Sequence, residues 1–400
     1  MKRLRLSVTK KKKKVLGVLS GTSVDAIDIA LVEIRGYGIK TRLKVIDFEA
    51  FPINSLIKDY ILKASTITSG NVESVCKTNF LIGKLFAEKI NLFLKRHKIS
   101  SDSIDFIGSH GQTIYHIPQN TKFLNYNLKS TLQVGDISVI SNLTGIPTIG
   151  DFRTADVALG GDGAPLVPYL DYILFRSSKK SRILINIGGI ANLTFLKAGA
   201  KHNEIIAFDT GPGNMLIDNY CQKFLNINFD KNGKIAQSAQ LTTTGEILLN
   251  KILNELDPYT RKKPPKSTGR EVYGEKFLQT ILKNARGLDK RQILKVLTKY
   301  TAISIIYNIE KYIRRKYKID EIYLSGGGAN NLFILNELKK HFTGIPVKKL
   351  EAKNGINVDN KEAVLFAVLA NEFVSHNPSN ITSVTGAKRN CILGKLSIPE

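Results

Sequence analysis

Two stretches of the chain share a hydrophobic pattern that predicts a β-hairpin. In residues 15–34 an apolar run leads into a turn of glycine and hydroxyl residues, and then into a second apolar run rich in Ile and Val, as in paired strands. Residues 181–196 repeat this design around two adjacent glycines. Because each hairpin opens about half of the chain, the repeat predicts two similar α/β domains. A third glycine turn, at 325–331, follows a strand-like run and precedes a helical pattern.

The remaining apolar positions predict helices and short buried strands. Residues 54–98 carry apolar side chains near the helical period and form a long amphipathic segment. Residues 293–314 and 359–373 are also predicted to be helical, and the second of these helices begins near Glu362. Residues 104–108 are predicted to form a buried strand that ends in a polar loop.

The segment from Thr148 to Pro168 is rich in glycine and shows no regular period. Long irregular stretches in compact enzymes are usually binding loops, so we expect a binding loop here. It carries Asp151 and Arg153, and the guanidinium of Arg153 is a rigid donor fork suited to a carboxylate or a phosphate.

The turn of the first hairpin contains residues that suit an anion. Gly21 allows backbone amides to approach a ligand, and the hydroxyls of Thr22 and Ser23 are further donors. Asp25 adds a carboxylate, and magnesium in proteins commonly uses one or two carboxylates together with phosphate oxygens. A phosphate with a divalent ion therefore fits this turn, although an ordinary tight hairpin explains the same stretch equally well when it is taken alone.

Asp209 follows the short predicted strand 205–208 and precedes glycines and a helical pattern. A carboxylate at a strand end is held by rigid backbone and is open to a ligand, as a general base requires. A helix cap would place an aspartate in the same position. The residues alone do not separate these two interpretations.

Composition changes this picture little. The chain has 400 residues and a formal net charge of +25, from 59 Lys and Arg against 34 Asp and Glu. Nucleic-acid binding would need this charge on one face or interleaved with aromatic residues, whereas the lysines are dispersed over predicted polar helix faces. The one charge block lies in residues 1–14, which we predict to be a disordered basic tail because the apolar run behind it is too short for a signal peptide.

Several protein classes are excluded by what the sequence lacks. No apolar run approaches the roughly 18 residues of a spanning helix, so we expect a soluble protein. The three cysteines, Cys76, Cys221 and Cys391, are far apart and lack zinc-site spacing, which fits a reducing cytoplasm. A GxxxxGK[ST] loop is absent, which excludes a P-loop, and the lack of a GxGxxG fingerprint argues against a dinucleotide fold.

Eight short motifs occur in order along the chain: Gly21-Thr22-Ser23-Val24-Asp25, Gly108-Ser109-His110-Gly111-Gln112-Thr113, Gly150-Asp151-Phe152-Arg153, Gly160-Gly161-Asp162-Gly163-Ala164-Pro165, Asn186-Ile187-Gly188-Gly189-Ile190, Asp209-Thr210-Gly211-Pro212-Gly213-Asn214, Lys266-Ser267-Thr268-Gly269-Arg270-Glu271 and Ser383-Val384-Thr385-Gly386-Ala387. With these motifs the chain resembles the anhydro-N-acetylmuramic acid kinases, a family of the sugar kinase, Hsp70 and actin superfamily. The resemblance runs from about Val15 to Leu393. It departs from the family at Ala26, where the family usually has Gly, and at Asp162, where it usually has Gln.

The resemblance implies an α/β fold of two RNase H-like domains that face an interdomain cleft, with ATP and Mg²⁺ bound there. We place domain I at residues 15–147 and domain II at 148–400, with a return of the C-terminal segment to domain I as the alternative. The implied reaction opens 1,6-anhydro-N-acetylmuramic acid with water and phosphorylates O6, giving N-acetylmuramic acid 6-phosphate and ADP during peptidoglycan recycling. A simple sugar kinase and an Hsp70-like ATP-driven binding protein are the alternatives. No nucleic-acid or membrane partner is implied, and a homodimer is compatible with the sequence.

The matched motifs also imply roles for single residues. Asp209 is implied as the catalytic base and Glu362 as a second carboxylate near the water. Asp25 is implied as the magnesium ligand. The implied nucleotide contacts are Gly21, Thr22, Ser23, Val24, Asp25, Ala26, Ile27, Asp28, Gly188, Gly189, Gly326, Gly327 and Gly328. The implied sugar contacts are His110, Gln112, Thr113, Asp151, Arg153, Gly211 and Asn214.

Two histidines follow the predicted strand 104–108 and admit more than one role. His110 and His116 are six residues apart, but as a metal pair they lack a visible third ligand. We favour hydrogen-bonding roles in a sugar pocket, and a structural histidine is the next interpretation.

Overall fold

The computed structural model describes residues 9–351 and 354–400. Its contacts form two compact units: unit 1 lies within Met1–Ile173 and Ala352–Glu400, and unit 2 is Leu174–Glu351. The C-terminal segment therefore belongs to the first unit, which is the alternative left open above. Over these two ranges, the structure contains no helix that is both long and apolar enough to cross a membrane.

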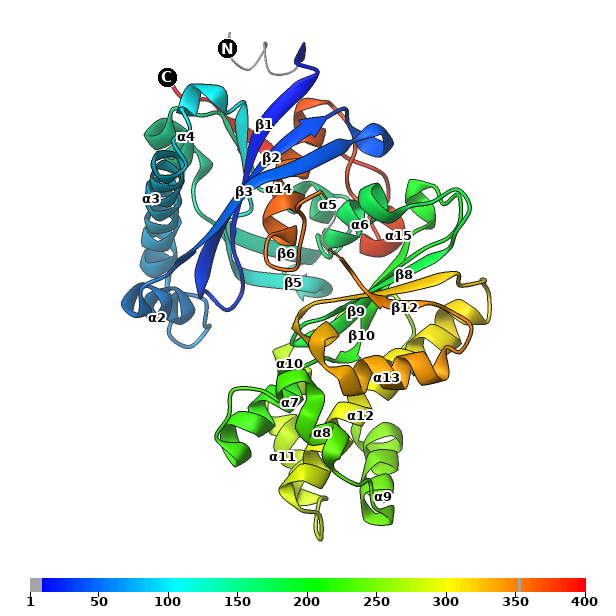
Figure 1. The fold of residues 1–400 in the computed structure, drawn as a ribbon. Helices are drawn as coiled ribbons and strands as arrows, with labels where there is room; N and C mark the ends of the chain where they lie inside the picture. The colour runs from blue at the N-terminus through cyan, green and yellow to red at the C-terminus, as the bar shows by residue number, and fades with distance from the viewer. Residues whose placement is uncertain (1–8, 352–353) are drawn as a thin grey trace. The chain divides into compact units, whose positions relative to one another are not determined.

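Unit 1 contains a six-stranded mixed sheet in the order β13-β7-β4-β1-β2-β3 and a separate two-stranded sheet, β5-β6. Figure 1 labels β1, β2 and β3 of the first sheet and both strands of the second. Its strands are β1 (Lys12–Ser20), β2 (Ala26–Arg35), β3 (Arg42–Pro52), β4 (Phe106–Ser109), β5 (Gln112–Phe123), β6 (Tyr126–Val134), β7 (Thr148–Gly150) and β13 (Lys395–Ser397). The first predicted hairpin is confirmed, since β1 and β2 pair antiparallel from Lys12↔Arg35 to Ser20↔Ile27.

The predicted boundary between residues 147 and 148 differs from the boundary in the structure, which lies at 173/174. The reason is that β7 pairs in parallel with β4 and so completes the first sheet. The segment from Thr148 to Pro168 is also less irregular than predicted, because it contains β7 and a short helix, α5.

The predicted disordered tail, residues 1–14, is wrong for its last three residues, because β1 begins at Lys12. Lys13 is buried, and its ammonium donates a hydrogen bond to Oδ1 of Asn371 (3.2 Å). Burial lowers the pKa of Lys13, against the opposing charges of Asp105 and Glu372. Residues 1–8 lie outside the described residues.

Helices pack on both faces of the large sheet in unit 1. The helices are α2 (Ser55–Ala64), α3 (Val72–Arg96), α4 (Ile137–Thr144), α5 (Thr154–Ala158), α6 (Val167–Phe175), α14 (Lys361–Val374) and α15 (Thr382–Thr385). Helix α14 lies directly on β1. The close approach occurs at Gly17, where an added Cβ would be only 1.8 Å from the carbonyl oxygen of Ala363. Leu16 and Val18 alternate with Gly17, so they face the other side, where they share an apolar cluster with Phe86 of α3.

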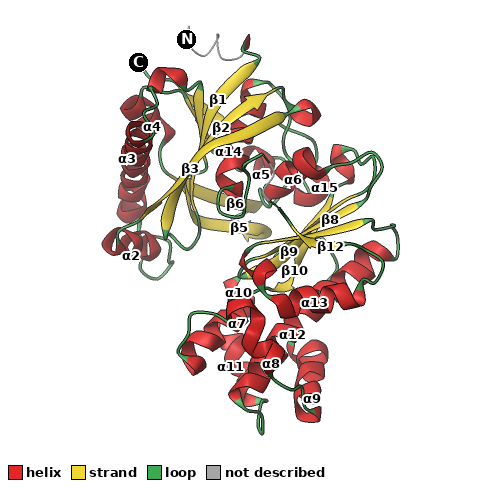
Figure 2. Ribbon diagram, viewed as in Figure 1, coloured by secondary structure: helices red, strands yellow, loops and turns green. Residues whose placement is uncertain are grey.

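Unit 2 contains a five-stranded sheet in the order β10-β9-β8-β11-β12, drawn in yellow in Figure 2. Its strands are β8 (Arg182–Ile187), β9 (Ile190–Leu196), β10 (Ile206–Pro212), β11 (Glu321–Ser325) and β12 (Val347–Lys349). The second predicted hairpin is confirmed, since β8 and β9 pair antiparallel from Arg182↔Leu196 to Ile187↔Ala191. Strand β11 runs parallel to β8, so the glycine turn after β11 lies beside the turn of this hairpin.

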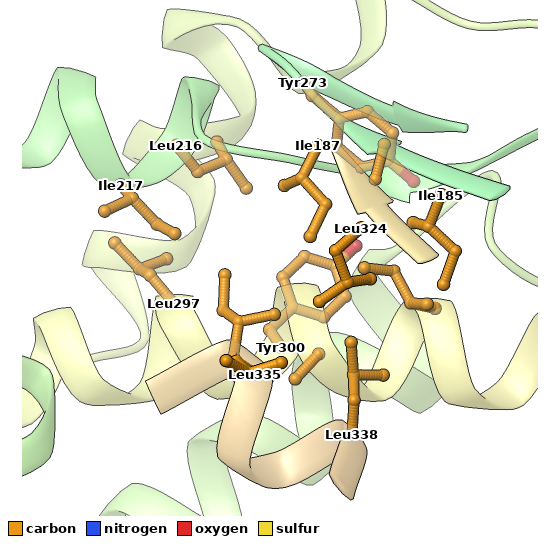
Figure 3. Packing of buried hydrophobic residues seen from close by; sticks show 14 of the residues in the cluster. Ile185, Ile187, Leu216, Ile217, Tyr273, Leu297, Tyr300, Leu324, Leu335 and Leu338 are labelled. Atoms are coloured by element: carbon orange, nitrogen blue, oxygen red, sulfur yellow. The ribbon is translucent and has the colours of Figure 1, made fainter. Parts of the chain in front are cut away.

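Helices and strands of unit 2 share one apolar core. Its helices are α7 (Met215–Tyr220), α8 (Lys234–Ser238), α9 (Thr243–Lys251), α10 (Arg270–Tyr273), α11 (Glu275–Lys283), α12 (Lys290–Ile309) and α13 (Leu332–His341). Figure 3 shows Ile187 and Leu324 of the sheet packed with Leu216, Leu297 and Leu335 of the helices, and all five side chains belong to one cluster. Packing of this kind holds the strand ends, and hence the turns that follow them, in fixed positions.

Candidate active site

In unit 1 the turn between β1 and β2 leaves its backbone open. The Val24 amide donates to the Gly21 carbonyl (3.0 Å), which closes the turn. A Cβ on Gly21 would meet no atom within 4 Å, and Thr22 and Ser23 are exposed. Ser20 is buried, and in the described part of the chain its hydroxyl has no hydrogen-bond partner. Because an unsatisfied buried hydroxyl is costly, Ser20 is suited to an oxygen-rich ligand at this turn.

Some of the predicted nucleotide contacts in this turn have side chains that face the protein core. Val24 and Ile27 are buried in the apolar cluster of unit 1. Only their backbone atoms are therefore available to a ligand. Ala26 is partly exposed, and it begins β2.

The two acidic residues of the hairpin have different surroundings. Asp25 is exposed, and a hydrogen bond from Lys58 lowers its pKa. Asp28 is half-buried on β2, and its pKa is raised to about 6, first by burial and then by the negative charges of Glu362 and Asp359. A divalent cation would neutralise this repulsion. Asp28 is therefore a better-placed carboxylate for a cation than the exposed, lysine-paired Asp25.

The described residues do not form a complete protein cage for a metal. In residues 9–351 and 354–400, no group of three or more His, Cys, Asp or Glu side chains could hold an ion. His110 and His116 therefore form no metal pair with a third ligand. Magnesium that is bound with a nucleotide takes most of its ligands from phosphate and water, so one carboxylate at this turn is compatible with it.

Arg153 and His110 bind each other in unit 1. Nε of Arg153 donates to Nε2 of His110 (3.0 Å), and Nη1 donates to the Gly163 carbonyl (2.7 Å). Nδ1 of His110 lies 3.2 Å from the Gly111 carbonyl, so we assign a neutral ring with its proton on Nδ1. Burial, followed by the charge of Arg153, holds the pKa of His110 well below its usual value. Both ring nitrogens are occupied, so the predicted sugar contact through this ring has no free nitrogen to use.

Glu362 lies in the first turn of α14 and is accessible to solvent. Surrounding protein partly desolvates its carboxylate, which raises its pKa, and the charges of Arg153 and Lys361 oppose this effect. Lys361 itself pairs with the buried Asp171 (2.5 Å). Glu362 is thus an open carboxylate that is held near a fixed guanidinium.

Gln112 has an acceptor that is left for a ligand. It is buried at the start of β5, and its Nε2 donates to the Thr113 carbonyl (3.2 Å). Its Oε1 has no partner among the described residues, so it is suited to a ligand N–H or O–H group. Asp151, by contrast, follows β7 with a φ of 56° and pairs with Lys395 (2.5 Å).

Asp156 is a residue whose role the sequence analysis did not identify. It is fully buried, and its Oδ2 accepts from the Gly163 amide (2.9 Å). Its Oδ1 accepts from Nδ2 of Asn380 (2.8 Å) and from Oγ1 of Thr385 (2.8 Å). Asp156 therefore ties the glycine-rich loop to the C-terminal motif. Asn380 and Thr385 are more than 220 residues away in the sequence, so no local pattern reveals them.

In unit 2 Asp209 lies within β10 at an irregularity of the sheet. Its register partner is Asn192, and the pairing shifts between Asp209 and Gly211. Oδ2 of Asp209 accepts from the Thr268 amide (2.8 Å) and the Ser267 hydroxyl (3.1 Å). Helix α7 instead begins after Asn214, so the helix-cap interpretation of Asp209 is wrong.

The electrostatics of Asp209 suit a general base. Desolvation raises its pKa to about 6, against the hydrogen bonds from Thr268 and Ser267 and the charge of Lys266. In the described part of the chain, its Oδ1 has no hydrogen-bond donor. At neutral pH the group is therefore mostly ionised, with one oxygen fixed and the other available to accept a proton.

The glycines of the two turns in unit 2 have two different roles. A Cβ on Gly213 would lie 2.2 Å from the Gly188 carbonyl oxygen, and one on Gly328 would lie 2.3 Å from a methyl of Ile187. A Cβ on Gly326 would similarly lie 2.6 Å from the Ile187 carbonyl oxygen. These positions are therefore glycine because the turns pack against each other.

Three other glycines of these turns, Gly188, Gly189 and Gly327, are accessible to solvent, and no rigid atom blocks an added Cβ. At Gly188 and Gly327 an added Cβ would meet nothing nearer than 3.6 Å, and at Gly189 the nearest atom is the flexible end of Met215, at 3.2 Å. The bare backbone of these glycines forms a cradle that side chains would otherwise fill. A flat or phosphorylated ligand can lie directly against such a backbone.

Two predicted sugar contacts have packing roles in unit 2. A Cβ on Gly211 would lie 2.9 Å from Oγ1 of Thr260 and 3.2 Å from Cβ of Ser304. The Asn214 amide donates to the Gly188 carbonyl (2.7 Å), and Asn214 Nδ2 is 3.4 Å from the Ile187 carbonyl oxygen. Both residues therefore fix the loop that follows Asp209, and their contacts with a sugar stay predictions.

The sequence of this chain is similar to those of known proteins. Residues 13–399 match the model of the family described as anhydro-N-acetylmuramic acid kinase. The chain belongs to this family. A protein with this name from Caldanaerobacter subterraneus subsp. tengcongensis is 42% identical over 402 residues, which cover 100% of both chains. A relative with the same name from Bacillus cereus (strain Q1) is 41% identical over 390 residues, or 96% of this chain and 99% of the relative.

Membership of this family makes the protein an ATP-dependent phosphotransferase that acts on a sugar. Among solved structures, component A of (R)-2-hydroxyglutaryl-CoA dehydratase from Acidaminococcus fermentans is 10% identical, with a TM-score of 0.44 over 91% of this chain and 99% of that chain. The family assignment therefore rests on the sequence relatives.

Proposed function

We propose that the protein converts 1,6-anhydro-N-acetylmuramic acid, ATP and water into N-acetylmuramic acid 6-phosphate and ADP. The observation that carries this proposal is the carboxylate of Asp209, of which one oxygen is held by two donors and the other is available, with a pKa of about 6. A simple sugar kinase would use such a base on the acceptor hydroxyl, whereas a hydrolytic kinase uses it on water. The full-length match to the family supports the same substrate, and we place this recycling of cell-wall sugar in the cytoplasm.

The proposed chemistry couples two bond exchanges. Oδ1 of Asp209 accepts a proton from a water molecule as that water attacks C1 of the sugar. The bond between C1 and O6 breaks, and its electron pair stays on O6. This oxygen then attacks the γ-phosphorus of ATP, and ADP leaves. Breaking the first bond thus generates the nucleophile for the second.

Residues of unit 1 supply the acidic and polar contacts in this proposal. Glu362 is a second carboxylate that would orient the water. The positive charge of Arg153 favours the ionised form of Glu362. Gln112 offers its free Oε1 to a hydroxyl or amide of the sugar. Asp28 and Asp25 would hold magnesium through the turn after β1, where the ion would neutralise phosphate charge. Asp28 is the stronger candidate of the two because its charge has no lysine partner in the described residues.

The nucleotide is proposed to lie on the glycine turns. Gly188, Gly189 and Gly327 are accessible to solvent, and backbone there can approach adenosine or phosphate without side-chain obstruction. In unit 1 the open backbone at Gly21 and the unpaired hydroxyl of Ser20 support a phosphate contact. The use of ATP by the family is consistent with a nucleotide contact at each of these turns.

The acceptor specificity tests this function directly. ADP release should be far faster with 1,6-anhydro-N-acetylmuramic acid than with open N-acetylmuramic acid or N-acetylglucosamine, because only the anhydro sugar releases an O6 alkoxide on ring opening. A coupled assay for ADP with the three sugars at equal concentration measures this preference. Faster turnover of an open sugar would contradict the hydrolytic mechanism and leave a simple sugar kinase.

A further inference from the structure

The ammonium group of Lys266 is enclosed by aromatic rings in unit 2. Its Nζ lies 4.8 Å from the ring centroid of Tyr259 and 5.7 Å from those of Phe208 and Tyr312. At such distances the ring faces attract a cation. Nζ also donates a hydrogen bond to the carbonyl oxygen of Thr260 (2.8 Å). The lysine is thus held by four groups, although it belongs to a loop.

The walls of this cage come from three separate segments. Phe208 belongs to β10 and directly precedes Asp209, and Tyr312 lies in the π-helical turn that continues α12. The Tyr312 hydroxyl is hydrogen-bonded to the carbonyls of Arg261 (3.2 Å) and Lys262 (3.0 Å). The cage therefore joins β10, the end of α12 and the loop that follows Tyr259.

The residues that bind Asp209 follow directly after the caged lysine. The carbonyl oxygen of Lys266 accepts from the Asp209 amide (3.3 Å). The next two residues, Ser267 and Thr268, supply both donors to Oδ2 of Asp209. In addition, the Tyr259 hydroxyl donates to the Asp209 carbonyl (3.2 Å). Whatever holds Lys266 therefore also holds the two donors of the proposed base.

We propose that Lys266 is a positioning residue: its caged ammonium fixes the loop whose Ser267 and Thr268 orient Asp209 and leave Oδ1 free. The proposal rests on the proposed function, because it gives Asp209 the role of base. Lys266 need not touch substrate in this account. It acts by holding the loop and by placing a positive charge near the carboxylate.

The ammonium group of Lys266 should lose its proton only slightly above neutral pH. Burial lowers its pKa to about 8, against the charges of Asp257 and Asp209. Raising the pH through this value removes the proton, so the attraction to the rings is lost and the loop should loosen. Turnover should then fall on the alkaline side. The other charged groups that affect these two residues are Lys311 and Lys262 for Lys266, and Glu271 for Asp209.

Lys266→Met tests the proposal, because methionine fills the cage without a charge. We expect kcat to fall about 10- to 100-fold, as for a misplaced catalytic group, while KM for ATP and for the sugar changes little. The acid limb of kcat/KM should move to higher pH, since the lysine charge favours the carboxylate of Asp209. The alkaline limb should disappear. Lys266→Arg keeps the cation and should restore most of the activity.

The exposed Lys263 offers a matched control, because Lys263→Met removes a nearby charge that is not one of those named above and should leave both limbs in place. Should Lys266→Met fail to fold, Tyr312→Leu removes one wall of the cage and should cause a smaller change of the same kind. Wild-type kcat and pH profile in the folded variant would overturn the proposal, as would a loss confined to the KM of the sugar.

A double variant separates this proposal from the proposed function. In the Asp209→Asn background, Lys266→Met should cause no further loss, because the two residues act through one group. Full activity of Asp209→Asn alone would refute the proposed base itself. An inactive Asp209→Asn together with additive losses in the double variant would refute only the role of Lys266.

Discussion

Replacing Asp209 with Asn should lower turnover about 10²- to 10⁴-fold, the usual contribution of a general base. Asparagine keeps the shape of the side chain and can still accept hydrogen bonds from Thr268 and Ser267 through its amide oxygen. It cannot accept a proton from water. Because ring opening and phosphoryl transfer share O6, sugar opening and ADP formation should fall by the same factor. Assays of both products, with thermal melting to confirm folding, measure this outcome.

Asp289 provides the control for this variant. It caps α12 through hydrogen bonds to the amides of Arg291 and Gln292, and asparagine is an equally good cap. Asp289→Asn should therefore leave turnover unchanged. A folded Asp209→Asn variant within a few-fold of wild-type activity would mean that another group is the base.

The pH profile of the wild-type enzyme gives a further outcome for Asp209. Its pKa is raised to about 6, and the base acts only in its ionised form. Turnover should therefore be fully present above this pKa and should fall as the pH drops through about 6. The pKa of Asp28 is also raised to about 6 without a cation, but magnesium bound during turnover would favour its ionised form, so the acid limb should follow a single group.

Gly327→Val should raise the KM for ATP about 10- to 100-fold, since a side chain at this position would occupy the proposed nucleotide cradle. An added Cβ meets no protein atom nearer than 3.6 Å, so the fold should survive the substitution. A purely structural glycine would behave in the opposite way: Gly326→Ala, whose Cβ would lie 2.6 Å from the Ile187 carbonyl oxygen, should lose stability. Titration of ATP in the kinase assay and a melting curve measure the two effects.

Gly199→Asn is the matched control for adding a side chain to a loop of unit 2. Gly199 has a φ of +69° and open space around it, and asparagine tolerates this conformation. Neither the KM for ATP nor the melting temperature should change. If Gly327→Val also left the KM for ATP unchanged, the third glycine turn, at 325–331, would not be part of the nucleotide site.

The glycine turns and their flanking strands could be predicted from the sequence, because apolar runs interrupted by glycine are local signals. The pairing of β7 with β4 could not, since it joins residues about 40 positions apart and depends on the whole sheet. For the same reason the predicted domain boundary was placed too early. Lys13 was predicted to lie in a tail because it belongs to a run of lysines. Such a run does not indicate which of its members the fold buries.

The sequence indicated which motifs belong to the candidate site, but it predicted the roles of single residues less well. The sequence could not distinguish Gly328, which is required by packing against Ile187, from Gly327, which borders open space. It offered Arg153 as a free donor fork, whereas two of its nitrogens are committed to His110 and Gly163. The cage around Lys266 was not foreseen, because its walls come from distant parts of the chain.

In the proposed reaction, water opens the sugar ring in the same turnover that phosphorylates O6. A single turnover in H₂¹⁸O, analysed by mass spectrometry before the anomeric oxygen can exchange, tests it most directly, with product incubated in H₂¹⁸O for the same time as the exchange control. We expect one labelled oxygen at C1, an unlabelled phosphate ester at O6, and one ADP for each sugar opened. Labelled inorganic phosphate beside an unopened sugar, or a product without label at C1, would contradict it.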